Sequence, residues 1–378
     1  PIVTQAYNRH MNKKKKKEII IKYNNYLDEK DKELEEERNL QKIILLENLI
    51  TVEQCLDIIV NKSLNFWDKR IDQNDFLVTR IGVGDEKLDV KIEYPEEGFT
   101  IEESELRKNA DKLIEKYKYI KSVPIGYSFY ENKITAIMGD RYKSLNFMHN
   151  TLLQLISFYS YEDLKIVTFT SEDNENNWNY LRYLNHSFNN DKSFRFFSSD
   201  IESAKKVSEY IYMEVTNRMN QVQNDRKNLF KPYYLIIVDD YDLVKRYEFM
   251  KTLTEMDVNL GFSLIIVENR LSNLPSKCNN FITIGKENSG VLKKSYEKQE
   301  QIIFKDEINY NIDMMQVAKV VSNVPIEFEE SIGHLPNSIT FLEMEKVGKV
   351  EQLNILNRWN TNDSTTSLKA EVGVDEQG

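Results

Sequence analysis

The chain has 378 residues, of which 40% are hydrophobic and 30% charged, and its formal net charge is -10. This composition is typical of a soluble globular protein with room for two domains or one enlarged domain. The acidic balance argues against a general nucleic-acid-binding surface, because phosphate contacts need a basic patch. Cys55 and Cys278 lie far apart without metal-ligand spacing, which indicates a reducing compartment and no structural zinc.

The charge and hydrophobic pattern of residues 1–50 predicts a helical juxtamembrane stalk. Arg9 and the five consecutive lysines Lys13 to Lys17 form a basic block, and a polar helix is expected from about 17 to 46. A run of like charges is usually a solvated face or a tail. If a transmembrane helix preceded the chain, the same block would be a cytoplasmic juxtamembrane signal.

Residues 51–130 are expected to form a small α/β lead-in element ahead of the main sheet. Thr51 and Gln54 have the capping-box spacing that begins a helix. Further on, the sequence predicts extended runs at Phe76 to Ile81, Asp89 to Tyr94 and Ile125 to Tyr130, and a helix at about 104–119.

Residues 131–360 alternate apolar strands with helices, which predicts an α/β fold with a mostly parallel sheet covered by helices on both faces. The expected strands are 134–138, 164–170, 193–197, 233–238, 262–267, 281–284 and 301–304, and the expected helices are 145–158, 178–186, a long helix after a capping box at Ser199 and Glu202, 244–256, and one ending near Trp359. Residues 361–378 are expected to be a linker.

The stretch from Tyr233 to Val238 organises this pattern. It is a continuous apolar run that ends on Asp239 and Asp240, and it fits a strand buried on both faces. In P-loop NTPases this is the Walker B layout, where one acid holds the Mg²⁺ shell and the next polarises water. Acids are also common exits of any buried strand, so this stretch alone leaves both interpretations open.

No GxxxxGK[ST] phosphate loop accompanies these acids. The nearest candidate follows the strand that ends near Met138, and its residues Gly139, Arg141, Lys143 and Ser144 would form a degenerate nucleotide site with Asp239, Asp240 and Asn269. Tyr142 replaces a glycine that the loop geometry requires, and Asp140 adds negative charge where phosphate needs positive charge. Mg·ATP is therefore a possible cofactor without a usual cradle.

Several motifs resemble the membrane-proximal ATPase-like domain of the EssC/EccC coupling proteins of type VII secretion, in the FtsK/SpoIIIE group. They are FWDKR (Phe66 to Arg70), NDFLVTRIGVG (Asn74 to Gly84), IMGDR (Ile137 to Arg141), LLQL (Leu152 to Leu155), NWNYLRYLNH (Asn177 to His186), IIVDDYD (Ile236 to Asp242), LPSKC (Leu274 to Cys278), LPNSITFLEM (Leu335 to Met344), NRWN (Asn357 to Asn360) and VGVDEQG (Val372 to Gly378). The chain departs from the family pattern at Asn185, where a proline is common, and at Tyr142.

The resemblance implies a P-loop NTPase-like fold of the RecA/FtsK type, and a fragment of a longer membrane protein located at the cytoplasmic face of the plasma membrane. It implies a hexamer that works with its neighbouring ATPase domains and other secretion-machinery subunits to export WXG-type proteins. We expect a non-hydrolysing coupler between downstream ATPases and the membrane channel. The alternatives are a weak ATPase that uses Asp239 and Asp240, and a DNA translocase, which the acidic balance disfavours.

Overall fold

The computed structural model describes residues 2–91, 103–224, 230–256, 258–285, 287–294, 299–326, 340–345 and 347–361. The chain divides into two compact units, Pro1–Asn323 and Val324–Gly378, and each is described by itself. The first unit contains the sheet and the candidate site. In the second unit, the described residues form the short helices α10 (Phe341–Met344) and α11 (Ile355–Thr361), with a 3₁₀ turn between them (Val350–Leu353).

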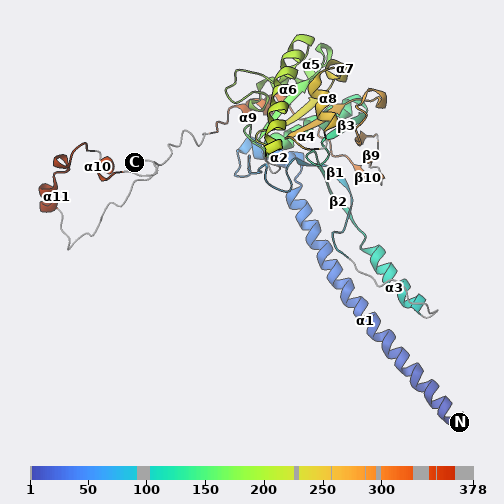
Figure 1. Ribbon diagram of the computed structural model, residues 1–378. Coiled ribbons are helices and arrows are strands. Elements are labelled where there is room, and N and C mark those ends of the chain that lie inside the picture. Colours follow the sequence, from blue (N-terminus) through green and yellow to red (C-terminus); the bar gives the residue numbers. More distant parts are fainter. Residues whose placement is uncertain are drawn as a thin grey trace. The chain divides into compact units, whose positions relative to one another are not determined.

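A ten-stranded sheet of order β2-β1-β10-β9-β8-β3-β7-β6-β4-β5 forms the centre of the first unit (Figure 1). Its strands are β1 (Val78–Lys87), β2 (Tyr119–Ser128), β3 (Ile134–Gly139), β4 (Leu164–Phe169), β5 (Phe197–Ser198), β6 (Tyr233–Val238), β7 (Phe262–Val267), β8 (Asn280–Ile284), β9 (Ser289–Lys294) and β10 (Gln299–Lys305). All pairings from β8 to β5 are parallel, and all pairings from β8 to β2 are antiparallel.

The parallel half places β7 between β3 and β6. Its central strands are buried along their whole length, as the apolar runs predict. Successive residues of β6 alternate between the two faces: Leu235 belongs to one core cluster and Ile236 to the other. The carboxyl ends of β3, β4, β6, β7 and β8 therefore meet at one edge of the sheet, which is where open α/β sheets bind ligands.

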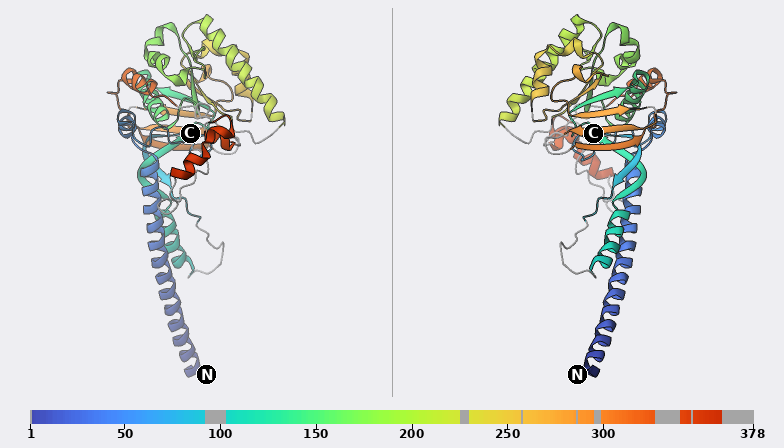
Figure 2. Two further views of the ribbon diagram at one scale, coloured as in Figure 1. Left: turned by 90° about the vertical axis from the view of Figure 1, so that its left-hand side faces the viewer. Right: turned by 90° about the vertical axis from the view of Figure 1, so that its right-hand side faces the viewer.

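Helices cover both faces of the sheet (Figures 1 and 2). The helices of the unit are α1 (Ile2–Asn48), α2 (Val52–Asn61), α3 (Glu103–Lys116), α4 (Arg141–Phe158), α5 (Glu175–Trp178), α6 (Ile201–Asn224), α7 (Tyr241–Val244), α8 (Glu248–Glu255) and α9 (Met314–Ser322). Side chains of α2, α4 and α9 share the larger core cluster, whereas those of α6, α7 and α8 form the core on the opposite face. The predicted α/β fold, with helices on both faces of the sheet, is confirmed.

Helix α1 begins well before the predicted stalk helix and contacts α3 and the antiparallel strands. Lys116 of α3 pairs with Asp31 at 2.5 Å, and the Gln41 side chain accepts the Asp89 N–H and donates to the Lys87 carbonyl. Figure 2 shows α3 running alongside α1. Within the described residues, no helix combines the length and apolarity that a membrane crossing requires.

The antiparallel half differs most from the sequence expectations. Strands β1 and β2 extend the main sheet instead of forming a separate small element, because β9 and β10 bridge them to β8. We did not predict β9 or helix α9. Of the expected run Asp89 to Tyr94, the last three residues lie outside the described residues, and the first three form no strand.

Five further expectations were wrong locally. Asp200 caps α6 by accepting the Ser203 N–H at 2.9 Å, so the capping box expected at Ser199 and Glu202 does not form. The strand expected at 193–197 is reduced to the two residues of β5, and the helix expected at 178–186 is a series of 3₁₀ turns. The helix expected at 244–256 is divided into α7 and α8, and the one expected to end near Trp359 is divided into α10, a 3₁₀ turn and α11. Of the expected linker, only Thr361 lies within the described residues.

Candidate functional site

Asp239 lies at the end of β6 and is neutralised by the chain itself. Its Oδ1 atom lies 2.6 Å from Nη2 of Arg141, and its Oδ2 atom accepts a 3.0 Å hydrogen bond from the Thr170 hydroxyl. The Asp239 side chain has no exposed surface, whereas that of Arg141 is 37% exposed. The arginine contact is not aligned as a hydrogen bond, so its attraction is mainly that of opposite charges in a poorly solvated place. Arg141 therefore supplies the positive charge that a bound cation would bring.

Gly139 ends β3 and has a conformation that only glycine adopts easily. Its φ is +127°, and a Cβ atom there would lie 2.2 Å from the Ile284 carbonyl oxygen. The Gly139 N–H donates to Oδ1 of Asn269 at 3.1 Å. Asn269 follows β7, and sequence analysis placed it in the degenerate nucleotide site. In the structure its side chain joins the β3 and β7 loops.

The first turn of α4 is closed by internal contacts as well. Asp140 caps the helix by accepting the Lys143 N–H at 3.0 Å, and a carboxylate at a helix N-terminus repels phosphate from the place that would otherwise attract it. The Lys143 ammonium donates to the Gly285 carbonyl at 2.9 Å. Ser144 is 1% exposed and its hydroxyl makes no hydrogen bond, so the terminal Lys-Ser pair resembles a phosphate loop in sequence but not in placement.

Asp240, the second acid of the strand exit, caps a helix. Its carboxylate accepts the Asp242 N–H at 3.0 Å, which begins α7. A capping carboxylate stabilises a helix start and is held in place by it. Asp240 therefore has a structural role, because its bonded oxygen faces the α7 backbone.

The predicted site residues therefore lie at one edge of the sheet, but as partners of their own chain. The Gly139 N–H, the Lys143 N–H and the Lys143 ammonium are bonded to protein oxygens, and the acid that could hold Mg²⁺ is paired with an arginine. The residues present do not fit a Mg·ATP cradle without rearrangement. Within the described residues, no group of three or more His, Cys, Asp or Glu side chains could hold a metal ion.

Sequence analysis missed Thr170 and Gly285. Thr170 follows β4, and the parallel register of Phe169 with Val238 brings it beside Asp239. A polar residue at the end of the strand adjacent to the acid strand was the available signal. Gly285 follows β8, and the strand order that places β8 beside β3 was not readable from the sequence.

The fold and this edge together define an α/β domain with helices on both faces of its sheet, in which the candidate site is closed by internal contacts. The chain is 28% identical over 374 residues to the type VII secretion system protein EssC of Staphylococcus aureus strain MSSA476, covering 98% of this chain and 25% of that protein. It is 23% identical over 368 residues to the ESX secretion system protein EccC of Geobacillus thermodenitrificans, covering 97% of this chain and 24% of that protein. The chain is a homologue of the EssC/EccC type VII secretion proteins along almost its whole length.

The chain spans about a quarter of the length of these relatives. Among solved structures, it is similar to the cytoplasmic domain of the type VII secretion ATPase EccC of Thermomonospora curvata, with a TM-score of 0.45 and 13% identity over 74% of this chain and 35% of that one. It is also similar to EssC (ATPases 2 and 3) of G. thermodenitrificans, with a TM-score of 0.44 and 13% identity over 68% of this chain and 50% of that one. No family model matches the chain.

Proposed function

We propose that this chain is a membrane-proximal, non-hydrolysing coupling domain of a type VII secretion motor. In this role it joins neighbouring ATPase domains to the membrane channel at the cytoplasmic face, within a hexamer, during export of WXG-type proteins. The homology to EssC and EccC supports the secretion role, and both relatives are named as secretion-system proteins.

The ion pair between Arg141 and Asp239 is the observation that carries the non-hydrolysing part of the proposal. Phosphoryl transfer depends on positioning and on charge neutralisation around the phosphates and Mg²⁺. Here a fixed side chain takes the cation's place at 2.6 Å from the acid. The Gly139 N–H and the Lys143 ammonium are likewise engaged by Asn269 and Gly285.

The test of this part is ATP turnover by the purified chain and by its Asp239→Asn variant. We expect phosphate release at the background rate from both proteins, because no Mg·ATP cradle is available. Turnover above background that Asp239→Asn abolishes would show that the acid is catalytic, and would favour the alternative of a weakly active ATPase.

The coupling part is tested in the full-length protein. We expect Asp239→Asn to leave export of the natural substrate nearly unchanged, since the acid is used structurally and the amide keeps its shape. Arg141→Glu places a second acid beside Asp239 and should reduce export by opening this edge. Export lost equally in both variants at normal protein levels would contradict a purely structural role of Asp239.

A further inference from the structure

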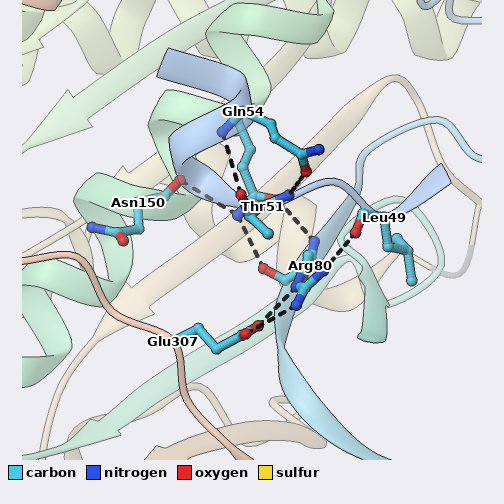
Figure 3. A network of polar contacts seen from close by, with 7 residues as sticks. Leu49, Thr51, Gln54, Arg80, Asn150 and Glu307 are labelled. Carbon is cyan, nitrogen blue, oxygen red and sulfur yellow. Dashed lines mark hydrogen bonds and ion pairs between the residues drawn. The ribbon is translucent and has the colours of Figure 1, made fainter. Parts of the chain in front are cut away.

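Arg80 connects the end of helix α1 to helix α4 through a compact set of polar contacts with Leu49, Gln154 and Glu307, which we call the Arg80 joint. Figure 3 shows Arg80 between Leu49 and Glu307. We propose that the Arg80 joint transmits movement of α1 to the Asp239 edge of the sheet. This inference rests on the proposed coupling function, since it names the path by which force would enter the domain.

The guanidinium of Arg80 binds two segments that are far apart in sequence. Its Nε and Nη2 atoms donate to the two carboxylate oxygens of Glu307 at 2.7 and 2.9 Å, and Nη1 donates to the Leu49 carbonyl at 3.0 Å. Leu49 directly follows α1, so its carbonyl is among those that a helix end leaves without an intrahelical partner. The Arg80 side chain is 10% exposed. A bidentate, largely buried guanidinium holds its partners in a defined geometry.

Two side-chain amides of helix α4, one helical turn apart, form paired hydrogen bonds with the backbone of Arg80 and of Asn309. The Gln154 amide accepts the Arg80 N–H at 2.9 Å and donates to the Arg80 carbonyl at 3.0 Å. The Asn150 amide treats the Asn309 backbone in the same way, accepting its N–H at 2.8 Å and donating to its carbonyl at 3.0 Å. Each amide thus accepts from and donates to one backbone residue, as a neighbouring strand would. The segments around Arg80 and Asn309 must therefore follow α4 when it moves.

The same helix ends at the candidate site. Arg141, its first residue, contacts Asp239, and the fourteen residues from Arg141 to Gln154 span about 20 Å of helix. Most residues of α4 are buried, and many of its side chains belong to the larger core cluster, so we expect the helix to move as a rod and not as a flexible segment. The path runs from the Leu49 carbonyl through Arg80 and Gln154 to Arg141.

The competing interpretation is that these contacts only hold neighbouring segments together, as a structural staple, and it makes a different prediction. Removal of a staple would loosen only the segments that it touches. If the joint transmits movement, its removal would also change the loop at the far end of α4, where the N–H groups of Gly139, Lys143 and Ser144 are engaged.

The packing beside the joint leaves a cavity of about 30 Å³, lined by Thr51, Phe147 and Gln154 among others, which is space for about one water molecule.

The test is hydrogen–deuterium exchange on the purified chain, without nucleotide, for the wild type and for Arg80→Gln and Glu307→Gln. We expect exchange of residues 139–144 to quicken by about tenfold in Arg80→Gln and by a smaller factor in Glu307→Gln. The matched control is Glu202→Gln, which removes an exposed ion pair with Lys206 on α6. It should not change the exchange of residues 139–144 or of the segments beside Arg80. If Arg80→Gln does not fold, Glu307→Gln alone decides, because it leaves the Leu49 contact in place.

Faster exchange confined to residues 45–52 and 304–309, with 139–144 unchanged, would overturn the proposal and leave a staple. A second readout uses the full-length protein, in which Glu307→Gln should lower export several-fold while total ATP turnover stays within about twofold of wild type. Unchanged export would also overturn it. Neither readout depends on whether Asp239 binds nucleotide, so a failure here is distinguishable from a failure of the proposed non-hydrolysing role.

Discussion

Two sets of polar contacts on helix α4 differ in kind. At its first turn, charged groups satisfy each other at the edge of the sheet, and Arg141 remains 37% exposed. In its middle, Asn150 and Gln154 are 5% and 2% exposed and grip two backbone segments with paired hydrogen bonds. The first place has the form of a ligand site filled by protein groups, whereas the second is part of the core. Mutations should therefore separate a replaceable edge from an indispensable centre.

The largest effect is expected from Gln154→Leu. This change leaves the Arg80 N–H and carbonyl without their side-chain partners in a buried place, and we expect a loss of about 2–4 kcal/mol in the free energy of unfolding. Urea denaturation followed by circular dichroism measures it. Asn146→Ala, at a half-buried site where the amide donates to the Tyr142 carbonyl of the same helix, is the control and should stay within about 0.5 kcal/mol of wild type. A loss no larger than that of Asn146→Ala would show that the contacts of Gln154 with the Arg80 backbone are not essential for stability.

His149, a half-buried histidine of the same helix, predicts a pH effect. Burial lowers the pKa of His149 to about 4 from 6.5, and the hydrogen bond with the Asn177 carbonyl only partly opposes it. Between pH 6.5 and 4 the unfolded chain binds more protons, so the contribution to stability is complete above pH 6.5 and is lost as the pH falls toward 4. At pH 5 the loss is about 2 kcal/mol. We expect His149→Gln to flatten the pH dependence of urea midpoints between pH 7 and 5, although His186, whose pKa burial also lowers to about 4, keeps part of it.

A smaller effect is expected from Arg141→Ala. Removing the guanidinium leaves a buried carboxylate without its cation, but the partial exposure of Arg141 lets water enter, so the loss should be about 1–2 kcal/mol. The freed Asp239 carboxylate oxygen is a hard ligand, and Mn²⁺ should then raise the melting temperature of this variant more than that of wild type. A double-mutant cycle with Asp239→Asn measures the pair directly. No coupling in that cycle would mean that the contact contributes nothing.

The smallest effect is expected from Lys143→Met. The ammonium donates to the Gly285 carbonyl at the partly exposed edge, and its loss should reduce the free energy of unfolding by less than about 1 kcal/mol. Thermal melting of the purified chain checks this value. A loss as large as that of Gln154→Leu would erase the distinction between the edge and the centre.

The parallel half of the sheet was predictable because each buried strand is a continuous apolar run. The run from Tyr233 to Val238 gave β6 its full length, and the run from Phe262 to Val267 did the same for β7. The antiparallel half was harder to predict, because Ser289–Lys294 is short, polar and interrupted by glycine. Its place depends on pairing with β8 and β10, and such tertiary pairing overrides local propensity.

The candidate site was predictable as a set of residues but not as a set of contacts. The positions of Gly139, Asp239 and Asn269 after successive strands indicated a common edge. The partner of each group depended on strand order and rotamers, so Arg141 was expected on phosphate and lies on Asp239 instead. The Arg80 joint was not foreseen, because Leu49, Gln154 and Glu307 are widely separated in sequence and carry no motif that signals a contact.

The most direct measurement is calorimetric titration of the purified chain with Mg·ATP, alongside Asp239→Asn and Arg141→Ala. The closed edge predicts no saturable heat from the wild type or from Asp239→Asn at high micromolar ATP. Saturable binding by the wild type that Asp239→Asn abolishes would contradict the central claim, because it would show that the internal contacts open to admit nucleotide and that Asp239 then serves the bound Mg²⁺.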